Sequence, residues 1–211
     1  MRQYIREPAE IYKKSFDTIL SEVDFTGYND QEKKIVTRII HACGDVSIAE
    51  DIFISENAIK SGISALKLGE KIFVDSKMVA AGIIEKNLKM SRIYCHIGDD
   101  DVADIAKKLN TTRSAVAVEH WKDGMSNSIL VIGNAPTALF RVLEIINENN
   151  IQPRLVIGMP LGFVGAVESK EELINFHQST GLNIITIRGR RGGSAMASAA
   201  INAISLLIDD R

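Results

Sequence analysis

Histidine is the side chain best suited to exchange a proton near neutral pH, because its unperturbed pKa is about 6.5. Among the histidines of this chain, His41 has the most distinctive neighbourhood. Arg38 precedes it by one helical turn, and Gly44 and Asp45 follow where a helix over this segment would end. His41 is therefore the candidate acid–base residue, with a structural role as the alternative.

The remaining histidines give weaker signals. His96 follows a cysteine near the end of an apolar run, whereas His120 and His177 lie in stretches with helical patterns. Packing or structural roles are expected for all three. Each of the two cysteines lies close to a histidine in the chain, but a third and a fourth ligand at a known metal-site spacing are missing. The sequence therefore predicts no metal site.

Arginines form one dense basic cluster, which consists of Arg188, Arg190 and Arg191. A guanidinium group binds a carboxylate or phosphate through two parallel hydrogen bonds. Arg113 lies in the first turn of a predicted helix that Thr112 can cap, and a cation there opposes the helix dipole unless an anion compensates it. These four arginines are predicted to bind an anionic ligand, and a solvated turn is the alternative for the cluster.

Composition and motifs exclude several function classes. The 211 residues carry a net charge of −2, which argues against a general nucleic-acid binder. The phosphate-binding patterns GxxxxGK[ST] and GxGxxG are absent, as is the GxSxG pattern of serine hydrolases. The longest apolar stretches contain Ser and Asn and are too short for a membrane span. A soluble cytoplasmic protein with reduced cysteines is expected.

The pattern of apolar residues predicts a three-layer α/β/α fold with a mostly parallel sheet of about five strands, because short apolar runs alternate with helical stretches. The predicted strands are Ile72–Val74, Arg92–Ile97, Ile129–Ile132, Leu155–Ile157 and Ile184–Ile187. The predicted helices begin at Pro8 and near Asn29 and then cover 56–68, 100–109, 112–122, 136–148, 169–179 and 193–208. We expect one domain over 1–211, with N-terminal helices over 8–45 and an α/β body over 46–211.

Ligands of open parallel sheets bind beyond the carboxyl ends of the strands, and glycine-rich loops follow three of the predicted strands. Asn134 and Thr137 belong to one of these loops, and Ser114 lies beside Arg113. These three residues join the predicted binding set. Ser15 is a further polar candidate, because it interrupts the apolar stripe of the first helix.

The chain also resembles the precorrin-8X methylmutase family, whose members include cobalt-precorrin-8 methylmutases, from Tyr4 to about Ala203. Six blocks in the family's order carry this resemblance: Ala9–Phe16, Arg38–Asp45, Thr112–Ala115, Val131–Arg141, Gly158–Lys170 and Arg188–Met196. The departures are mild. Leu161 stands where valine is common, and His120 stands where an aliphatic residue is usual.

The resemblance implies an isomerase that moves a methyl group from the α-carbon of ring C of a tetrapyrrole to the adjacent β-carbon. The product would be hydrogenobyrinate or cobyrinate, depending on whether the substrate carries cobalt, and no cofactor is implied. The resemblance assigns the catalytic histidine to His41 and substrate contacts to Ser15 and Arg38. It also implies a homodimer. The ligand would be a polycarboxylate, which suits the arginines. A non-catalytic tetrapyrrole carrier and a nucleotide- or RNA-binding module are the alternatives.

Overall fold

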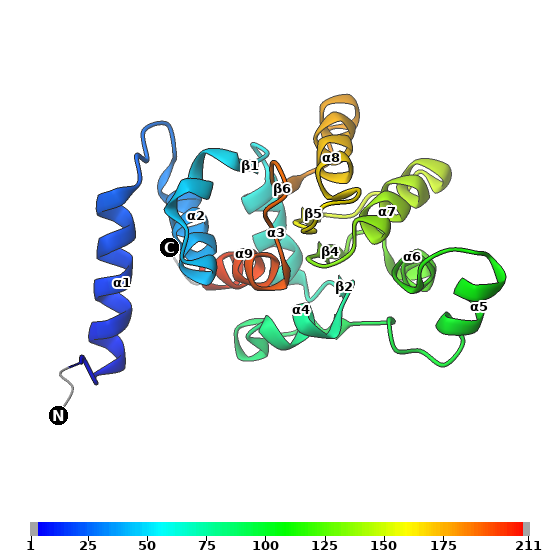
Figure 1. Ribbon diagram of the computed structural model, residues 1–211, viewed down its shortest axis with the longest axis horizontal. Coiled ribbons are helices and arrows are strands. Elements are labelled where there is room, and N and C mark those ends of the chain that lie inside the picture. The colour runs from blue at the N-terminus through cyan, green and yellow to red at the C-terminus, as the bar shows by residue number, and fades with distance from the viewer. Residues whose placement is uncertain (1–3, 209–211) are drawn as a thin grey trace.

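A six-stranded sheet lies at the centre of the computed structural model, which describes residues 4–208 (Figure 1). The strand order is β1-β6-β5-β4-β2-β3, and all neighbouring pairs are parallel except β1 and β6. Phe53 of β1 lies opposite Thr186 of β6 in the antiparallel pair. The strands are β1 (Ile52–Ile54), β2 (Ile72–Val74), β3 (Ile93–Tyr94), β4 (Ile129–Ile132), β5 (Leu155–Gly158) and β6 (Ile184–Ile187).

Helices cover both faces of the sheet, so the predicted three-layer α/β/α architecture is confirmed (Figure 1). One face packs against α3 (Ala58–Leu68), α4 (Lys77–Gly82) and α9 (Ser194–Leu206), and α2 (Asp30–Cys43) packs on the outer side of α9. The other face packs against α7 (Pro136–Asn149) and α8 (Ala166–Thr180), and α6 (Arg113–Glu119) packs against α7. The short helix α5 (Val102–Lys108) lies beside α6.

Strand β4 illustrates why the sequence folds this way. Its four residues are all fully buried, with Ile129 and Val131 in the core on the α9 side and Leu130 and Ile132 in the core on the α7 side. Successive side chains of a strand point to opposite faces, so a strand covered on both faces must be apolar throughout. This rule explains why the short apolar runs were recognisable as strands.

Three details differ from the sequence-based expectation. The sheet has a further strand, β1, which forms an antiparallel edge directly after the 3-10 helix η1 (Val46–Asp51). The expected strand 92–97 is ordered as a strand only at Ile93–Tyr94. The six-residue helix α4 was not expected at all. Each of these elements is too short for a hydrophobic period to become visible. The other connections are the 3-10 helices η2 (Glu85–Asn87) and η3 (Lys122–Gly124).

Helix α9 is buried on nearly its whole circumference, because it lies between the sheet and α2. Its small residues, mostly alanine and serine, allow this close approach on two sides. Helix α1 (Pro8–Glu22) is the opposite case: it lies at the outer edge of the molecule against α2, and only Ile19 of its residues is buried (Figure 1). In the part of the chain that the structure describes, no helix is long and apolar enough to cross a membrane.

Candidate active site

His41 lies at the end of α2, and local signals fix its place there. The side chain of Asn29 accepts hydrogen bonds from the first turn of α2, and Glu32 completes a capping box. At the other end Gly44 adopts a left-handed conformation with φ 70°, which terminates the helix directly after Cys43. His41 is therefore in the last turn, and Arg38 lies one turn before it on the side that faces α1.

Helix α1 supplies the partners of His41. The Ser15 Oγ lies 2.9 Å from the His41 Nδ1, and the rings of Tyr12 and Phe16 lie 5.6 and 5.3 Å from the imidazole. The Arg38 guanidinium lies 5.6 Å from the centre of the Tyr12 ring and 5.8 Å from that of Phe16. The structure thus brings together three of the candidate residues, Ser15, Arg38 and His41, and adds the aromatic side chains of Tyr12 and Phe16.

The contact with Ser15 determines which nitrogen of His41 is available. If the imidazole is neutral and the Ser15 hydroxyl donates to Nδ1, the ring proton lies on Nε2. If the ring is an imidazolium, Nδ1 donates to Ser15 Oγ and Nε2 still carries a proton. A neutral imidazole can also carry its proton on Nδ1 and donate it to Ser15 Oγ, and Nε2 is then an acceptor. In every state Nε2 is the ring nitrogen that remains for a ligand. Ser15 therefore orients the ring so that Nε2 is the nitrogen available to a ligand.

His41 borders a pocket of about 370 Å³ between α2, α4 and α9. Asn202 of α9 shapes it, since its side chain accepts a hydrogen bond from the Ile84 amide and donates one to the Gly82 carbonyl, both at 2.8 Å. Met78, which belongs to α4, was not predicted as a site residue, because α4 itself was not expected from the sequence. The lining residues are Arg38, His41, Ala42, Met78, Gly82, Ala195, Ser198, Ala199 and Asn202.

The arginine cluster divides into two kinds of side chain. Arg191 forms ion pairs with Asp45 and Asp51 at 2.7 Å each, and it also donates to the Ser47 hydroxyl at 2.6 Å. The hydrogen bond that Arg191 donates to Asp45 raises the pKa of Arg191, so this side chain is a permanent cation. These contacts connect the loop after β6 to the segment that follows α2. Arg191 thus joins the His41 helix to the glycine-rich loop.

Arg188 and Arg190 are exposed, and within residues 4–208 neither forms an ion pair with Asp45 or Asp51. Arg188 lies 5.6 Å from the centre of the Phe53 ring, and Arg190 lies 5.5 Å from that of Phe163. Arg190 and Arg191 also border a second pocket, of about 330 Å³. Its other lining residues are Leu161, Gly162, Phe163, Gly192 and Met196. Both pockets touch the first turn of α9, the first at Ala195 and the second at Met196.

Gly192 fixes the path of this loop. It has φ 157°, and a Cβ atom at this position would lie 2.4 Å from the Met159 carbonyl oxygen. Lys170 of α8, which is buried, donates to the Arg191 carbonyl at 2.6 Å. Burial lowers the pKa of Lys170 to about 8. The backbone of the loop after β6 is therefore hydrogen-bonded to α8 and packs closely against Met159, which follows β5.

The predicted residues Asn134, Thr137, Arg113 and Ser114 form a second group at the same edge of the sheet. The buried carboxylate of Asp75 accepts hydrogen bonds from the backbone amides of residues 133–135 at 2.8 to 3.0 Å and so fixes the loop after β4. Burial raises the pKa of Asp75, and these amides oppose the rise.

The side chain of Thr137 connects this loop to α6. Its hydroxyl lies 2.8 Å from that of Thr112, the residue that caps α6 just before Arg113 and Ser114. Arg113, Asn134 and Thr137 are exposed and Ser114 is half-buried. Within residues 4–208, none of the four lines the pocket of His41. The predicted binding residues thus form two groups instead of one continuous set.

Comparisons with known proteins identify the family. A sequence model of the Precorrin-8X methylmutase family matches residues 10–207. A protein of Pseudomonas aeruginosa named Precorrin-8X methylmutase is 45% identical over 97% of this chain and 98% of its own length. A Cobalt-precorrin-8 methylmutase of Priestia megaterium is 38% identical over 96% of this chain and 89% of its own length.

A solved structure agrees with the sequence relatives. The crystal structure titled as the precorrin-8x methyl mutase from Thermus thermophilus is 31% identical, covers 96% of this chain and 97% of its own, and superimposes with a TM-score of 0.85. The match extends over helix α1, the sheet and α9 alike, since it leaves out so little of either chain. The chain belongs to the precorrin-8X methylmutase family of isomerases.

Proposed function

We propose that this chain moves the ring-C methyl group of precorrin-8X or cobalt-precorrin-8 to the adjacent β-carbon, which gives hydrogenobyrinate or cobyrinate. The single observation that supports a catalytic rather than a carrier function is the Ser15–His41 pair at the edge of a pocket. A carrier needs shape and charge complementarity to its ligand. It does not need an imidazole that is held at one nitrogen while the other nitrogen is available to exchange a proton with the ligand.

In the proposed mechanism, His41 donates the Nε2 proton to the nitrogen of ring C. The ring becomes electron-poor, the bond between the methyl carbon and the α-carbon breaks, and a bond to the adjacent β-carbon forms along the conjugated system. The proton then returns to His41, so the reaction is an isomerisation that needs no donor or oxidant. General acid catalysis of this kind contributes roughly 10²–10⁴-fold in rate.

The carboxylate arms of the macrocycle supply the binding energy that positions ring C. We assign Arg38, Arg188 and Arg190 to carboxylates near the two pockets. Arg191 already has two carboxylate partners, so its contribution is to hold the loop in place and to add positive charge to a substrate arm beside it. The second group is assigned to the arms farther from His41; it comprises Arg113, Ser114, Asn134 and Thr137.

The domain, assembly and location belong to the same proposal. Residues 1–211 act as one domain, because buried side chains of α2 share a core with the sheet. A homodimer is supported by α1, whose apolar side chains Ile11, Tyr12 and Leu20 are exposed at 47%, 38% and 50%. Covering them with a second copy removes apolar surface from water. We place the protein in the cytoplasm, where its free cysteines Cys43 and Cys95 stay reduced.

Incubation with each of the two substrates tests the function. We expect the absorbance spectrum of at least one substrate to convert to that of its product, and to do so catalytically at substrate excess. A protein that binds both substrates and leaves their spectra unchanged over many hours would be a carrier, and the proposal would be wrong. Ser15→Ala should turn over more slowly than the wild type, because its imidazole is no longer oriented.

A further inference from the structure

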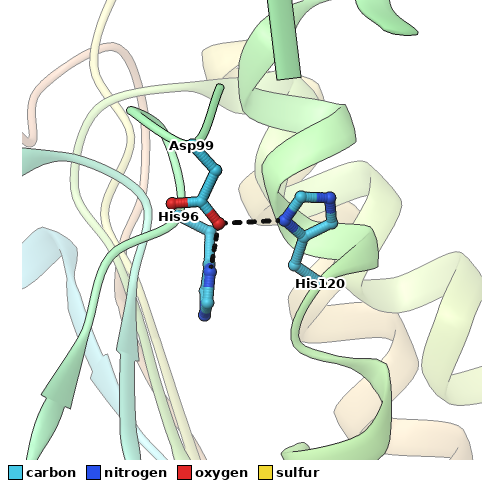
Figure 2. Close-up of side chains that lie close together, drawn as sticks. All are labelled: His96, Asp99 and His120. Atoms are coloured by element: carbon cyan, nitrogen blue, oxygen red, sulfur yellow. Dashed lines mark hydrogen bonds and ion pairs between the residues drawn. The ribbon is translucent and has the colours of Figure 1, made fainter. Parts of the chain in front are cut away.

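A histidine and an aspartate of one loop meet a histidine from a second segment at a point outside the pockets described above. His96 follows β3, Asp99 lies in the turn before α5, and His120 caps the carboxyl end of α6. The Nδ1 atoms of His96 and His120 lie 2.7 and 3.1 Å from the same Asp99 oxygen, Oδ2. Figure 2 shows the two imidazoles approaching this carboxylate from different parts of the chain.

We propose that His96, Asp99 and His120 form a binding site for a divalent first-row transition metal, with His96 Nδ1, His120 Nδ1 and an Asp99 oxygen as ligands. Imidazole nitrogens and a carboxylate oxygen suit Zn²⁺, Co²⁺ and Ni²⁺ rather than Mg²⁺ or Ca²⁺, which prefer oxygen ligands. The site is independent of the proposed function, since none of its residues borders the pocket of His41.

The distances fit such an ion. Ligand atoms at about 2.1 Å from a metal are roughly 3.0 Å apart at octahedral angles and roughly 3.4 Å apart at tetrahedral angles. The two nitrogen–oxygen distances, 2.7 and 3.1 Å, lie close to the shorter of these edges. All three ligand atoms lie within 4.8 Å of one another. A metal therefore needs only small side-chain movements to take the place of the hydrogen-bonding protons.

A second carboxylate supports this assignment. Asp101 Oδ2 lies 3.4 Å from His120 Nε2, the nitrogen that faces away from Asp99. Metal-binding histidines commonly donate their other N–H group to a carboxylate, which fixes the ring and makes the ligand nitrogen more basic. His120 thus has a ligand position on one side and a supporting acceptor on the other.

The surroundings hold the rings and leave an entry path. The His96 and His120 rings are 5.6 Å apart at 75°, and Phe73 lies 6.3 Å from His96 and stacks on Trp121. The side chains of His96 and His120 are 27% and 24% exposed, and that of Asp99 is 41% exposed. Solvent can therefore reach the cluster and fill the remaining coordination positions with water.

The structure also supplies a reporter. Trp121 follows His120 directly and is the chain's single tryptophan. Its indole is fully buried in the stack with Phe73. A paramagnetic ion bound at the site should quench its fluorescence, because the two groups are neighbours.

Titration of the untagged full chain with Co²⁺ tests the proposal, with visible absorption and tryptophan fluorescence as readouts. We expect saturable binding of one ion per chain, with d–d absorption bands and quenching at the same concentrations. His120→Gln should weaken binding by about 100-fold or more, and Asp101→Asn by about 10-fold. His177→Gln is the matched control, since the His177 ring contacts the Leu182 carbonyl and the Phe53 ring and belongs to α8, and it should bind as the wild type does.

Each contrary result would overturn the site. If His120→Gln, shown by circular dichroism to be folded, binds Co²⁺ as tightly as the wild type, the ion is bound elsewhere. A thiolate-to-cobalt charge-transfer band would mean that a cysteine is a ligand, which contradicts the proposed donor set. Loss of binding in His41→Asn would place the ion at the catalytic pocket. Absence of saturable binding to the wild type would refute the site altogether.

Discussion

Arg191 allows a decisive test of what the glycine-rich loop does. Its two ion pairs lie at 2.7 Å, but the side chains of Arg191, Asp45 and Asp51 are 42%, 42% and 37% exposed. Solvent screens exposed pairs of this kind, so their contribution to the free energy of unfolding is small. We expect Arg191→Gln to lower the free energy of unfolding only slightly, and we expect a larger effect on the loop position than on the fold.

A double-mutant cycle with Asp51→Asn separates an internal connection from direct binding of the substrate. If Arg191 acts mainly through Asp51, the two single variants should raise KM by similar factors. The double variant should then be no worse than either single variant, because they remove the same contact. If Arg191 bound the substrate alone, a charge-assisted contact worth about 1.5–3 kcal/mol would be lost whatever residue stands at position 51.

The measurements are urea unfolding for stability and initial rates over a range of substrate concentrations for KM. Additive losses of substrate affinity in the Arg191→Gln and Asp51→Asn variants would refute the connection between loop and helix end. The folded fraction of each variant is checked by circular dichroism at the assay temperature, so that a loss of protein is not mistaken for a loss of binding.

Three further perturbations follow from the geometry. His41→Asn should abolish turnover and leave the affinity for product within a few-fold of wild type in an absorbance titration; measurable turnover would move the proton transfer to another group. Lys170→Met tests the buried amine, whose pKa is about 8 in the folded chain against 10.5 for an ordinary lysine. Between these two pH values the unfolded state binds more protons than the folded state, so the stability of the wild type relative to the variant should rise with pH. We expect a rise of up to about 3 kcal/mol in the free energy of unfolding, measured with urea. A pH-independent difference would contradict this. Gly192→Ala should lower the melting temperature more than Gly181→Ala does. Both glycines have a positive φ, but only at Gly192 would the new Cβ atom meet a carbonyl oxygen. Equal losses of melting temperature would show that the loop adjusts.

The sheet was predictable because parallel strands covered on both faces must be apolar at every position. Ile184–Ile187 was found with the same bounds in sequence and structure, whereas Ile52–Ile54 was missed. The missed strand has partners on one side only, pairs antiparallel and follows a 3-10 turn, so its three residues give no period of their own. The pairing that makes it a strand comes from β6, which lies far away in the chain.

Separation along the chain also explains which features of the site could be predicted from the sequence. Ser15 and Arg38 were assigned to the site because the blocks of the resemblance contain them, and the structure places both beside His41 through the contact of α1 with α2. The ion pair of Arg191 with Asp51 could not be predicted from the sequence, because the two residues are 140 positions apart. Only the antiparallel pairing of β1 with β6 brings them together. A guanidinium that looks available in the sequence is therefore committed in the fold. Its charge is no guide to which arginine binds the substrate, so the choice among Arg188, Arg190 and Arg191 must follow from which of them still has a free hydrogen-bonding edge.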